Sequence, residues 1–211
     1  MPKFPAPSHW AAVAEDFAHK LEAVVRFLQS GVERGDDCVL VIPESDRSRW
    51  EQALAERGVV PDPSAGVQLM AAREWVPPRG LNSLRMTRRL WDRIENALLS
   101  FREFRIAIDM AWTLESAVDA AQVCHWEATC DHLLGSEAHA HMLCVYNPDE
   151  LPVPQVHAGL RTHGHIDCGT GLAANPFFEA PAILEHEPAL NSCSGDAAIV
   201  NGMLGHFRRA A

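Results

Sequence analysis

Two short segments of the chain combine histidine and cysteine at the same spacing. Residues 139–144 and residues 163–168 both follow the pattern H-x-H-x-x-C. Imidazole nitrogen and thiolate sulfur are ligands that zinc, copper and iron take in proteins. The pattern therefore predicts a transition-metal site with ligands drawn from His139, His141, Cys144, His163, His165 and Cys168.

The same segments have a second interpretation. The apolar run from His141 to Tyr146 predicts a β-strand, and on a strand His141 and Cys144 point to opposite faces. Those two side chains then share a metal only if the strand bulges. The chain contains 11 histidines, so hydrogen-bonded or surface imidazoles are the alternative to metal ligands.

A different candidate site follows from the places where the predicted strands end. Open parallel sheets bind ligands beyond the carboxyl ends of their strands. Those ends carry aromatic rings and a methionine beside a few carboxylates, which is typical of a small-molecule pocket. The candidate ligand-binding residues are Trp75, Asp109, Met110, Trp112, Glu115 and Tyr146. The alternative is that the two tryptophans only cover the rim of the core.

These sites depend on short apolar strands that alternate with longer helical patterns. Apolar residues at helical spacing predict helices over 19–33, 45–57, 81–102 and 114–134. Such alternation is typical of right-handed crossovers and a mostly parallel sheet, so we expect a three-layer α/β fold with helices on both faces. The neighbouring parallel strands are expected to be Cys38–Ile42, Val67–Ala71, Arg105–Asp109 and Met142–Tyr146.

The pattern weakens after Asn147, where proline, glycine and histidine become frequent. The segment Ile166–Leu172 predicts an edge strand or a hairpin. Ile199–Phe207 predicts a short amphipathic helix.

The turn after the first of these strands lacks the features of a phosphate loop. Its residues, Pro43-Glu44-Ser45-Asp46, include no glycine or lysine, and their two carboxylates repel phosphate. The chain also has no G-x-S-x-G nucleophile motif. Nucleotide hydrolysis is therefore not expected. The sequence leaves open whether the chain is an enzyme and favours that it is not.

The composition of the chain argues against some classes of binding partner. The net charge of -10 argues against direct nucleic-acid binding and against an anionic membrane surface. No apolar run approaches the roughly 20 residues of a spanning helix. The segment from Met1 to His9 has no apolar stretch behind it, so no secretory signal is expected. We expect a cytoplasmic protein with reduced thiols.

Several short motifs resemble one known family. They are Phe27-Leu-Gln-Ser-Gly-Val-Glu-Arg-Gly-Asp-Asp-Cys-Val-Leu-Val-Ile-Pro43, Ile108-Asp-Met-Ala-Trp112, His125-Trp-Glu127, Leu143-Cys-Val-Tyr-Asn147 and Asn175-Pro-Phe-Phe-Glu179. In this order they resemble the MEDS domain, the methanogen/methylotroph sensory domain named for a dichloromethane-responsive repressor.

The resemblance implies a RecA-like, Rossmann-like fold that has lost its phosphate loop, and a sensory role proposed for small hydrocarbon derivatives. It places a sensory domain over residues 12–188 and a C-terminal extension over 189–211. Asp109 stands where the family usually has glutamate, and Ile108 where it usually has glycine, so the ligand is expected to differ.

The first hypothesis is therefore a non-catalytic sensory domain that binds a small, largely apolar ligand or cofactor. It would signal through a downstream regulatory protein, because no helix-turn-helix or kinase pattern is found, and a homodimer is left open. The alternative is a metal- or thiol-dependent protein, either an enzyme or a redox sensor, that uses the two H-x-H-x-x-C segments. A purely structural α/β domain is the third reading.

Overall fold

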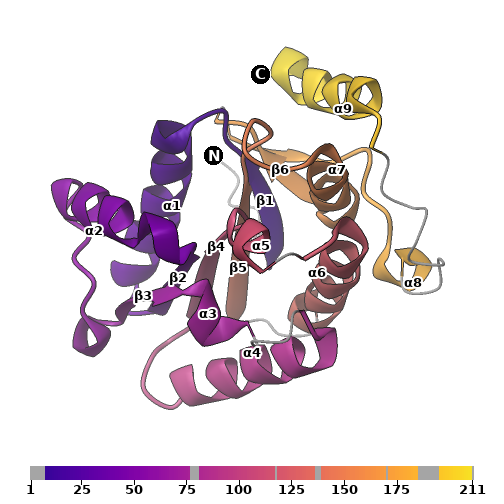
Figure 1. Ribbon diagram of the computed structural model, residues 1–211. Coiled ribbons are helices and arrows are strands. Elements are labelled where there is room, and N and C mark those ends of the chain that lie inside the picture. Colours follow the sequence, from indigo (N-terminus) through magenta and orange to yellow (C-terminus); the bar gives the residue numbers. More distant parts are fainter. Residues whose placement is uncertain are drawn as a thin grey trace.

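A computed structural model describes residues 8–76, 81–116, 118–135, 139–169, 171–184 and 195–210 (Figure 1). Seven strands form one sheet in the order β3-β2-β4-β5-β1-β6-β7. The strands are β1 His9–Val13, β2 Asp37–Ile42, β3 Val67–Ala71, β4 Phe104–Asp109, β5 Ala140–Tyr146, β6 His165–Asp167 and β7 Leu172–Ala174. The helices are α1 Phe17–Val32, α2 Arg47–Glu56, α3 Ala72–Trp75, α4 Ser83–Ala97, α5 Trp112–Glu115, α6 Ala120–Gly135, α7 Val153–Thr162, α8 Pro181–Leu184 and α9 Ala197–Ala210, with 3₁₀ turns η1 Glu44–Asp46 and η2 Pro63–Ala65.

The expected parallel strands are confirmed. Strands β3, β2, β4 and β5 are neighbours, and each pair is parallel, with Ile42 opposite Ala71 and Ile106 opposite Met142. Among the described strands of the sheet only β7 runs antiparallel to its neighbour, as the second strand of the hairpin that the sequence predicts near residue 166. The three-layer α/β arrangement is therefore confirmed.

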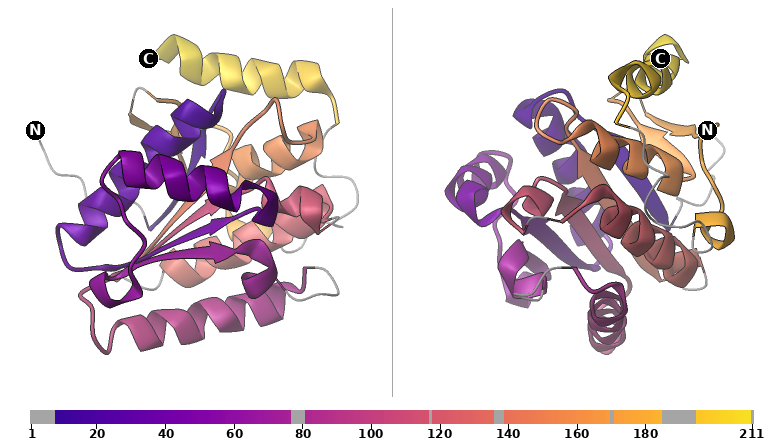
Figure 2. Two further views of the ribbon diagram at one scale, coloured as in Figure 1. Left: turned by 60° about the vertical axis from the view of Figure 1, so that its left-hand side comes forward. Right: turned by 45° about the vertical axis from the view of Figure 1, so that its right-hand side comes forward.

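Alternating side chains of the strands enter two separate cores. On β2, Cys38 and Leu40 pack into a cluster with α1 and α2, while Val39 and Val41 pack into a cluster with α4, α6 and α7. Period-two alternation with both faces buried is what a parallel sheet between two helical layers requires. Figures 1 and 2 show α1 and α2 on one side of the sheet and α4 and α6 on the other.

Strand β1 and helix α7 were not predicted. Strand β1 lies between β5 and β6, with Ala11 paired to Cys144 on one side and to Ile166 on the other. Helix α7 begins at Val153 directly after a proline and has a second proline in its first turn, where a missing N–H costs nothing. The expected domain start at residue 12 thus falls inside β1. The expected boundary between 188 and 189 lies outside the described residues.

The prediction of one helix over 114–134 is wrong, because α5 and α6 are separate. Asp119 explains the break. Its carboxylate accepts a hydrogen bond from the backbone N–H of Gln122 (2.8 Å), and the Gln122 side chain accepts one from the backbone N–H of Asp119 (3.1 Å). This reciprocal pair is a capping box, which starts a new helix at Ala120. The amphipathic helix expected near the C-terminus is present as α9. None of the described helices is long and apolar enough to cross a membrane.

A buried ion group connects α1 to the end of β4, on the face of the sheet that α1 covers. The Lys20 ammonium lies 3.0 and 3.1 Å from the two carboxylate oxygens of Asp109, at the end of β4, and also contacts Glu150. The Lys20 and Asp109 side chains are 1% and 0% exposed. Burial raises the pKa of Asp109, although the Lys20 charge opposes that effect. The ion group therefore fixes the depth at which α1 packs on the sheet.

We expect Lys20→Met to lower the free energy of unfolding by about 3–5 kcal/mol at pH 7, since it leaves a buried carboxylate unpaired. A carboxyl whose folded-state pKa is raised holds its proton more tightly when folded. The loss of unfolding free energy in Lys20→Met should therefore shrink as the pH falls through the raised pKa of Asp109. Urea unfolding at pH 7 and pH 5 measures both effects.

As a control, Arg57→Met breaks the exposed pair with Glu22 and should cost less than about 1 kcal/mol. An equal loss for the two variants would contradict the ion group's role.

Candidate metal centre

The carboxylate of Glu127 lies in the core of the domain. Glu127 comes from α6, on the face that also carries Val123, Trp126 and Cys130, and its side chain has no exposed surface. An ionised carboxylate at such a site must be paired and hydrogen-bonded, because burial removes its hydration. Its partners therefore define the site.

Four side chains from three other parts of the fold surround this carboxylate. His9 comes from β1, Cys144 and Tyr146 come from β5, and His163 is the residue that ends α7. Cys144 and Tyr146 are two residues apart on a strand, so both face α6. His9 faces the same way because β1 pairs with β5 in parallel register.

The turn that carries His163 is held by the segment that follows β7. The Asn175 side chain donates hydrogen bonds to the carbonyl oxygens of Leu160 (2.5 Å) and His163 (2.6 Å). Nearby, Arg161 makes two contacts with the carboxylate of Glu179, at 2.5 and 2.6 Å. These bonds fix the end of α7 and thus the direction of the His163 ring.

His9, Glu127, Cys144 and His163, here called the central group, place their donor atoms close together. Glu127 Oε2 lies 3.1 Å from His9 Nε2, 3.4 Å from Cys144 Sγ and 3.6 Å from His163 Nε2. Cys144 Sγ is 3.6 Å from His9 Nε2, and all four donor atoms lie within 4.8 Å of one another. Metal–ligand bonds of 2.0 to 2.3 Å in a tetrahedron separate the ligand atoms by about 3.3–3.7 Å, so the spacing suits a four-coordinate ion.

Each member of the central group except the thiol also has a contact on its other side. The Tyr146 hydroxyl donates to Glu127 Oε1 (2.7 Å), and His163 Nδ1 donates to the carbonyl of Gly159 (2.8 Å). His9 Nδ1 lies 3.4 Å from an Asp131 oxygen, which is an ion-pair distance rather than a good hydrogen bond. Such outer partners orient metal-binding histidines and carboxylates in known sites.

His163 gives the clearest indication of a missing partner. Because Nδ1 carries the proton that goes to Gly159, Nε2 is left with its lone pair directed toward the other three donors. The side chain is fully buried, and within the described part of the chain Nε2 has no hydrogen-bond partner. Burial and the neighbouring His9 lower the pKa of His163 to about 4, so the ring is neutral and ready to bind a cation.

The remaining charges favour one proton arrangement in the absence of an ion. Burial lowers the pKa of His9, but the carboxylates of Asp131 and Glu127 outweigh it and raise that pKa to about 9. Burial raises the pKa of Glu127, yet His163 and His9 outweigh it, and the net pKa is lowered. Burial raises the pKa of the Cys144 thiol well above its usual value. A bound cation would take the places of the His9 and Cys144 protons.

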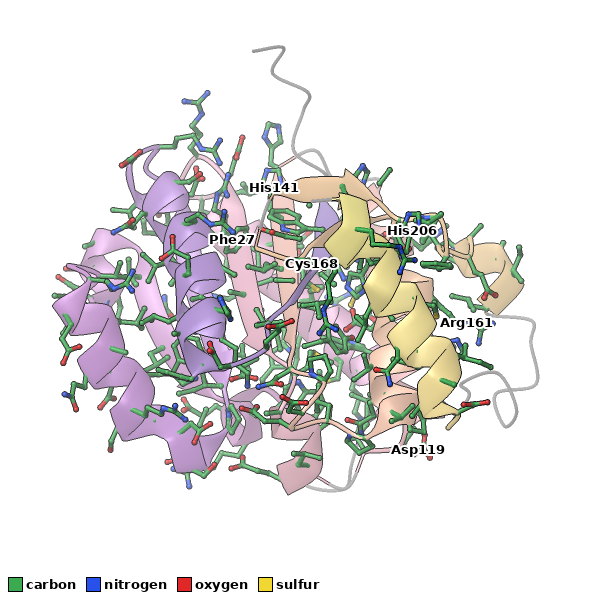
Figure 3. All side chains as sticks on the ribbon, turned by 90° about the horizontal axis from the view of Figure 1, so that it is seen from above. Phe27, Asp119, His141, Arg161, Cys168 and His206 are labelled. Atoms are coloured by element: carbon green, nitrogen blue, oxygen red, sulfur yellow. The ribbon has the colours of Figure 1, made fainter. Side chains whose placement is uncertain are left out.

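The structure brings two of the six predicted metal-ligand residues into the central group, namely Cys144 and His163. His141, labelled in Figure 3, instead has its Nε2 3.2 Å from Glu103. His139 precedes β5, while His165 and Cys168 lie in and beyond β6, and none of the three is part of the group of described residues that could hold a metal. Sequence reasoning missed His9 and Glu127. The helical position of Glu127 between apolar residues was the available signal.

The candidate residues at the carboxyl edge of the sheet are mostly core. Trp75, Met110, Trp112 and Tyr146 are 0–4% exposed and belong to one hydrophobic cluster. Asp109 is paired with Lys20. The Glu115 carboxylate accepts hydrogen bonds from the backbone N–H groups of Glu44 and Ser45, both at 3.0 Å. Glu115 therefore occupies the turn where a phosphate loop would hold phosphate.

A substitution at Gly159 tests how tightly the Tyr146 ring packs against α7. A methyl group on its Cα would lie 2.5 Å from Cζ of the Tyr146 ring, so Gly159→Ala must displace that ring or α7. We expect a loss of about 1–3 kcal/mol in the free energy of unfolding, measured by urea denaturation. Gly202→Ala in α9 is the matched control, because nothing lies within 4 Å of its added methyl. An unchanged stability for Gly159→Ala would contradict the packing of Tyr146 against α7.

No curated protein sequence matches this chain. A family model described as the methanogen/methylotroph, DcmR sensory domain (MEDS) matches residues 8–164. The matched range covers most of the 211 residues and contains the whole central group. The chain therefore belongs to the MEDS sensory domain family.

Proposed function

We propose that this MEDS domain is a non-catalytic sensor whose cofactor is a transition-metal ion of the zinc class, bound by His9, Glu127, Cys144 and His163. The observation that carries the proposal is the buried Nε2 of His163, which has no hydrogen-bond partner among the described residues. It faces a carboxylate, an imidazole and a thiol that lie at tetrahedral ligand spacing.

The donor set supports this class of ion. Two imidazoles, one thiolate and one carboxylate suit zinc and similar borderline ions, whereas magnesium and calcium prefer oxygen ligands alone. The four donors would complete a tetrahedron without water. Catalytic zinc sites keep a position open for water or substrate, so a closed set favours a sensory or structural role over catalysis.

The positions of the ligands support coupling between the ion and the fold. His9 is on β1, Cys144 on β5, Glu127 on α6 and His163 at the end of α7. An ion held by all four stabilises the packing of β1 and α7 on the rest of the sheet, because binding free energy at such a site adds to folding free energy. In this proposal a partner protein reads the resulting change in packing.

Zinc binding tests the proposal directly. We expect one zinc ion per chain after reconstitution, measured by elemental mass spectrometry on desalted protein. Free zinc at 100 times its Kd should stabilise the fold by about 2.7 kcal/mol. For a domain of this size that corresponds to a rise in Tm of roughly 5–10 °C, which a chelator should reverse.

Two pairs of variants locate the ion. His163→Ala and Cys144→Ser should lose the bound zinc and the rise in Tm. His125→Ala, exposed on α6, and Cys168→Ser, outside the central group, should keep both. Circular dichroism checks that the variants fold. Stoichiometric zinc in folded His163→Ala, or no zinc in the unmodified protein, would refute the proposal.

A further inference from the structure

Strand β1 presents side chains to both faces of the sheet. His9 faces the central group, and the next residue, Trp10, faces the opposite side, where it stacks edge-on against Phe27 of α1 (5.3 Å between ring centroids). A cavity of about 300 Å³ lies here between α1, the sheet and the β6–β7 hairpin. None of the residues that line the cavity belongs to the central group.

Both apolar and basic side chains line the cavity. Trp10, Phe27 and Leu143 supply the apolar surface, and Arg26, Arg34 and Arg105 border it. The Arg105 guanidinium also lies over the Phe27 ring, 5.2 Å from its centroid, which fixes that ring in place. A ligand with a flat apolar body would therefore lie against two aromatic rings.

The charges that line the cavity are unbalanced. Three arginines face one carboxylate, Asp167, whose Oδ2 lies 2.6 Å from an Arg26 nitrogen. Arg105 and Arg34 pair with Asp36 and also lie 3.8 and 3.7 Å from a carboxylate oxygen of Glu103, and neither of these acids lines the cavity. A guanidinium has five N–H donors, so these contacts leave donors for an anion.

A second cavity of about 280 Å³ continues the first along α1. The two share Ala23, Arg26 and Asp167, so the Arg26–Asp167 ion pair stands between them. Phe27, in the first cavity, and Cys168, in the second, are labelled in Figure 3. Arg26 is 47% exposed, and its side chain is accessible from solvent at this junction.

We propose that the first cavity binds a small aromatic carboxylate, with the rings of the ligand against Trp10 and Phe27 and its carboxylate on Arg26. Arginine recognises carboxylates by paired, charge-assisted hydrogen bonds. A volume of about 300 Å³ is at the lower end for ligand pockets, so a two-ring acid is the appropriate size. A neutral or cationic analogue lacks the charge that the arginines require.

The probe for this site is 2-naphthoate, titrated into the protein by isothermal titration calorimetry. Its neutral amide and 2-naphthylmethylamine are the controls for charge. We expect the amide to bind at least about tenfold more weakly than the carboxylate, because hydrogen bonds to a charged group are the stronger ones. The amine should not bind. Equal affinity for the acid and the amide would overturn the proposal, as would no binding of the acid at about 10 mM.

Variants of the lining residues test whether the ligand binds in the first cavity. Arg26→Gln should weaken 2-naphthoate binding about three- to tenfold through loss of the charged contact. Trp10→Ala should weaken it at least about tenfold, and Trp10→Phe should restore much of the affinity. Arg88→Gln, on the exposed face of α4, is the matched control and should leave binding unchanged. Unchanged binding in folded Arg26→Gln and Trp10→Ala would place the ligand elsewhere and overturn the proposal.

Zinc content separates this site from the central group. Arg26→Gln should keep its full complement of zinc, because Arg26 touches none of the four proposed ligands. Loss of zinc in folded Arg26→Gln would contradict the placement of Arg26 in a site apart from the zinc ligands.

Discussion

A carboxylate with no exposed surface is the constraint on which this fold depends. Glu127 lies between α6 and the sheet. Its partners are His9 on β1, Cys144 and Tyr146 on β5, and His163 at the end of α7. Without them, an ionised carboxylate at this depth would cost several kcal/mol. Because β1 lies between β5 and β6, it places the His9 imidazole against Glu127.

The position of β1 gives the domain two chemically different faces. On one side His9 completes a compact group of nitrogen, oxygen and sulfur donors. On the other side Trp10 lies in a cavity bordered by arginines. Because the two residues are adjacent on one strand, a shift of β1 that affects one site would displace the other. A sensory domain can use such an arrangement to combine a bound cofactor with a second signal.

Much of the sheet could be predicted from the sequence, because β2, β4 and β5 are short continuous apolar runs buried on both faces. Strand β1 could not, since it has only five residues, begins with histidine and follows a proline-rich segment. Helix α7 was missed for a related reason. Its prolines suggested irregular structure, whereas at the start of a helix they are tolerated.

The candidate metal ligands could likewise be predicted only in part from the sequence. The H-x-H-x-x-C pattern includes two members of the central group, Cys144 and His163, but spacing along the chain says little about which side chains meet in three dimensions. Strand alternation separates His141 from Cys144, and the actual neighbours of Cys144 are His9, 135 residues away, and Glu127 on a helix. Only the sheet order, with β1 beside β5, brings them together.

X-ray absorption at the zinc edge of the reconstituted protein tests the central claim most directly, because it counts and identifies the atoms bound to the ion. The proposal predicts one sulfur at about 2.3 Å and three nitrogen or oxygen atoms at about 2.0–2.2 Å. A shell without sulfur, a shell with two or more sulfurs, or a six-coordinate shell of oxygen atoms would contradict binding by His9, Glu127, Cys144 and His163.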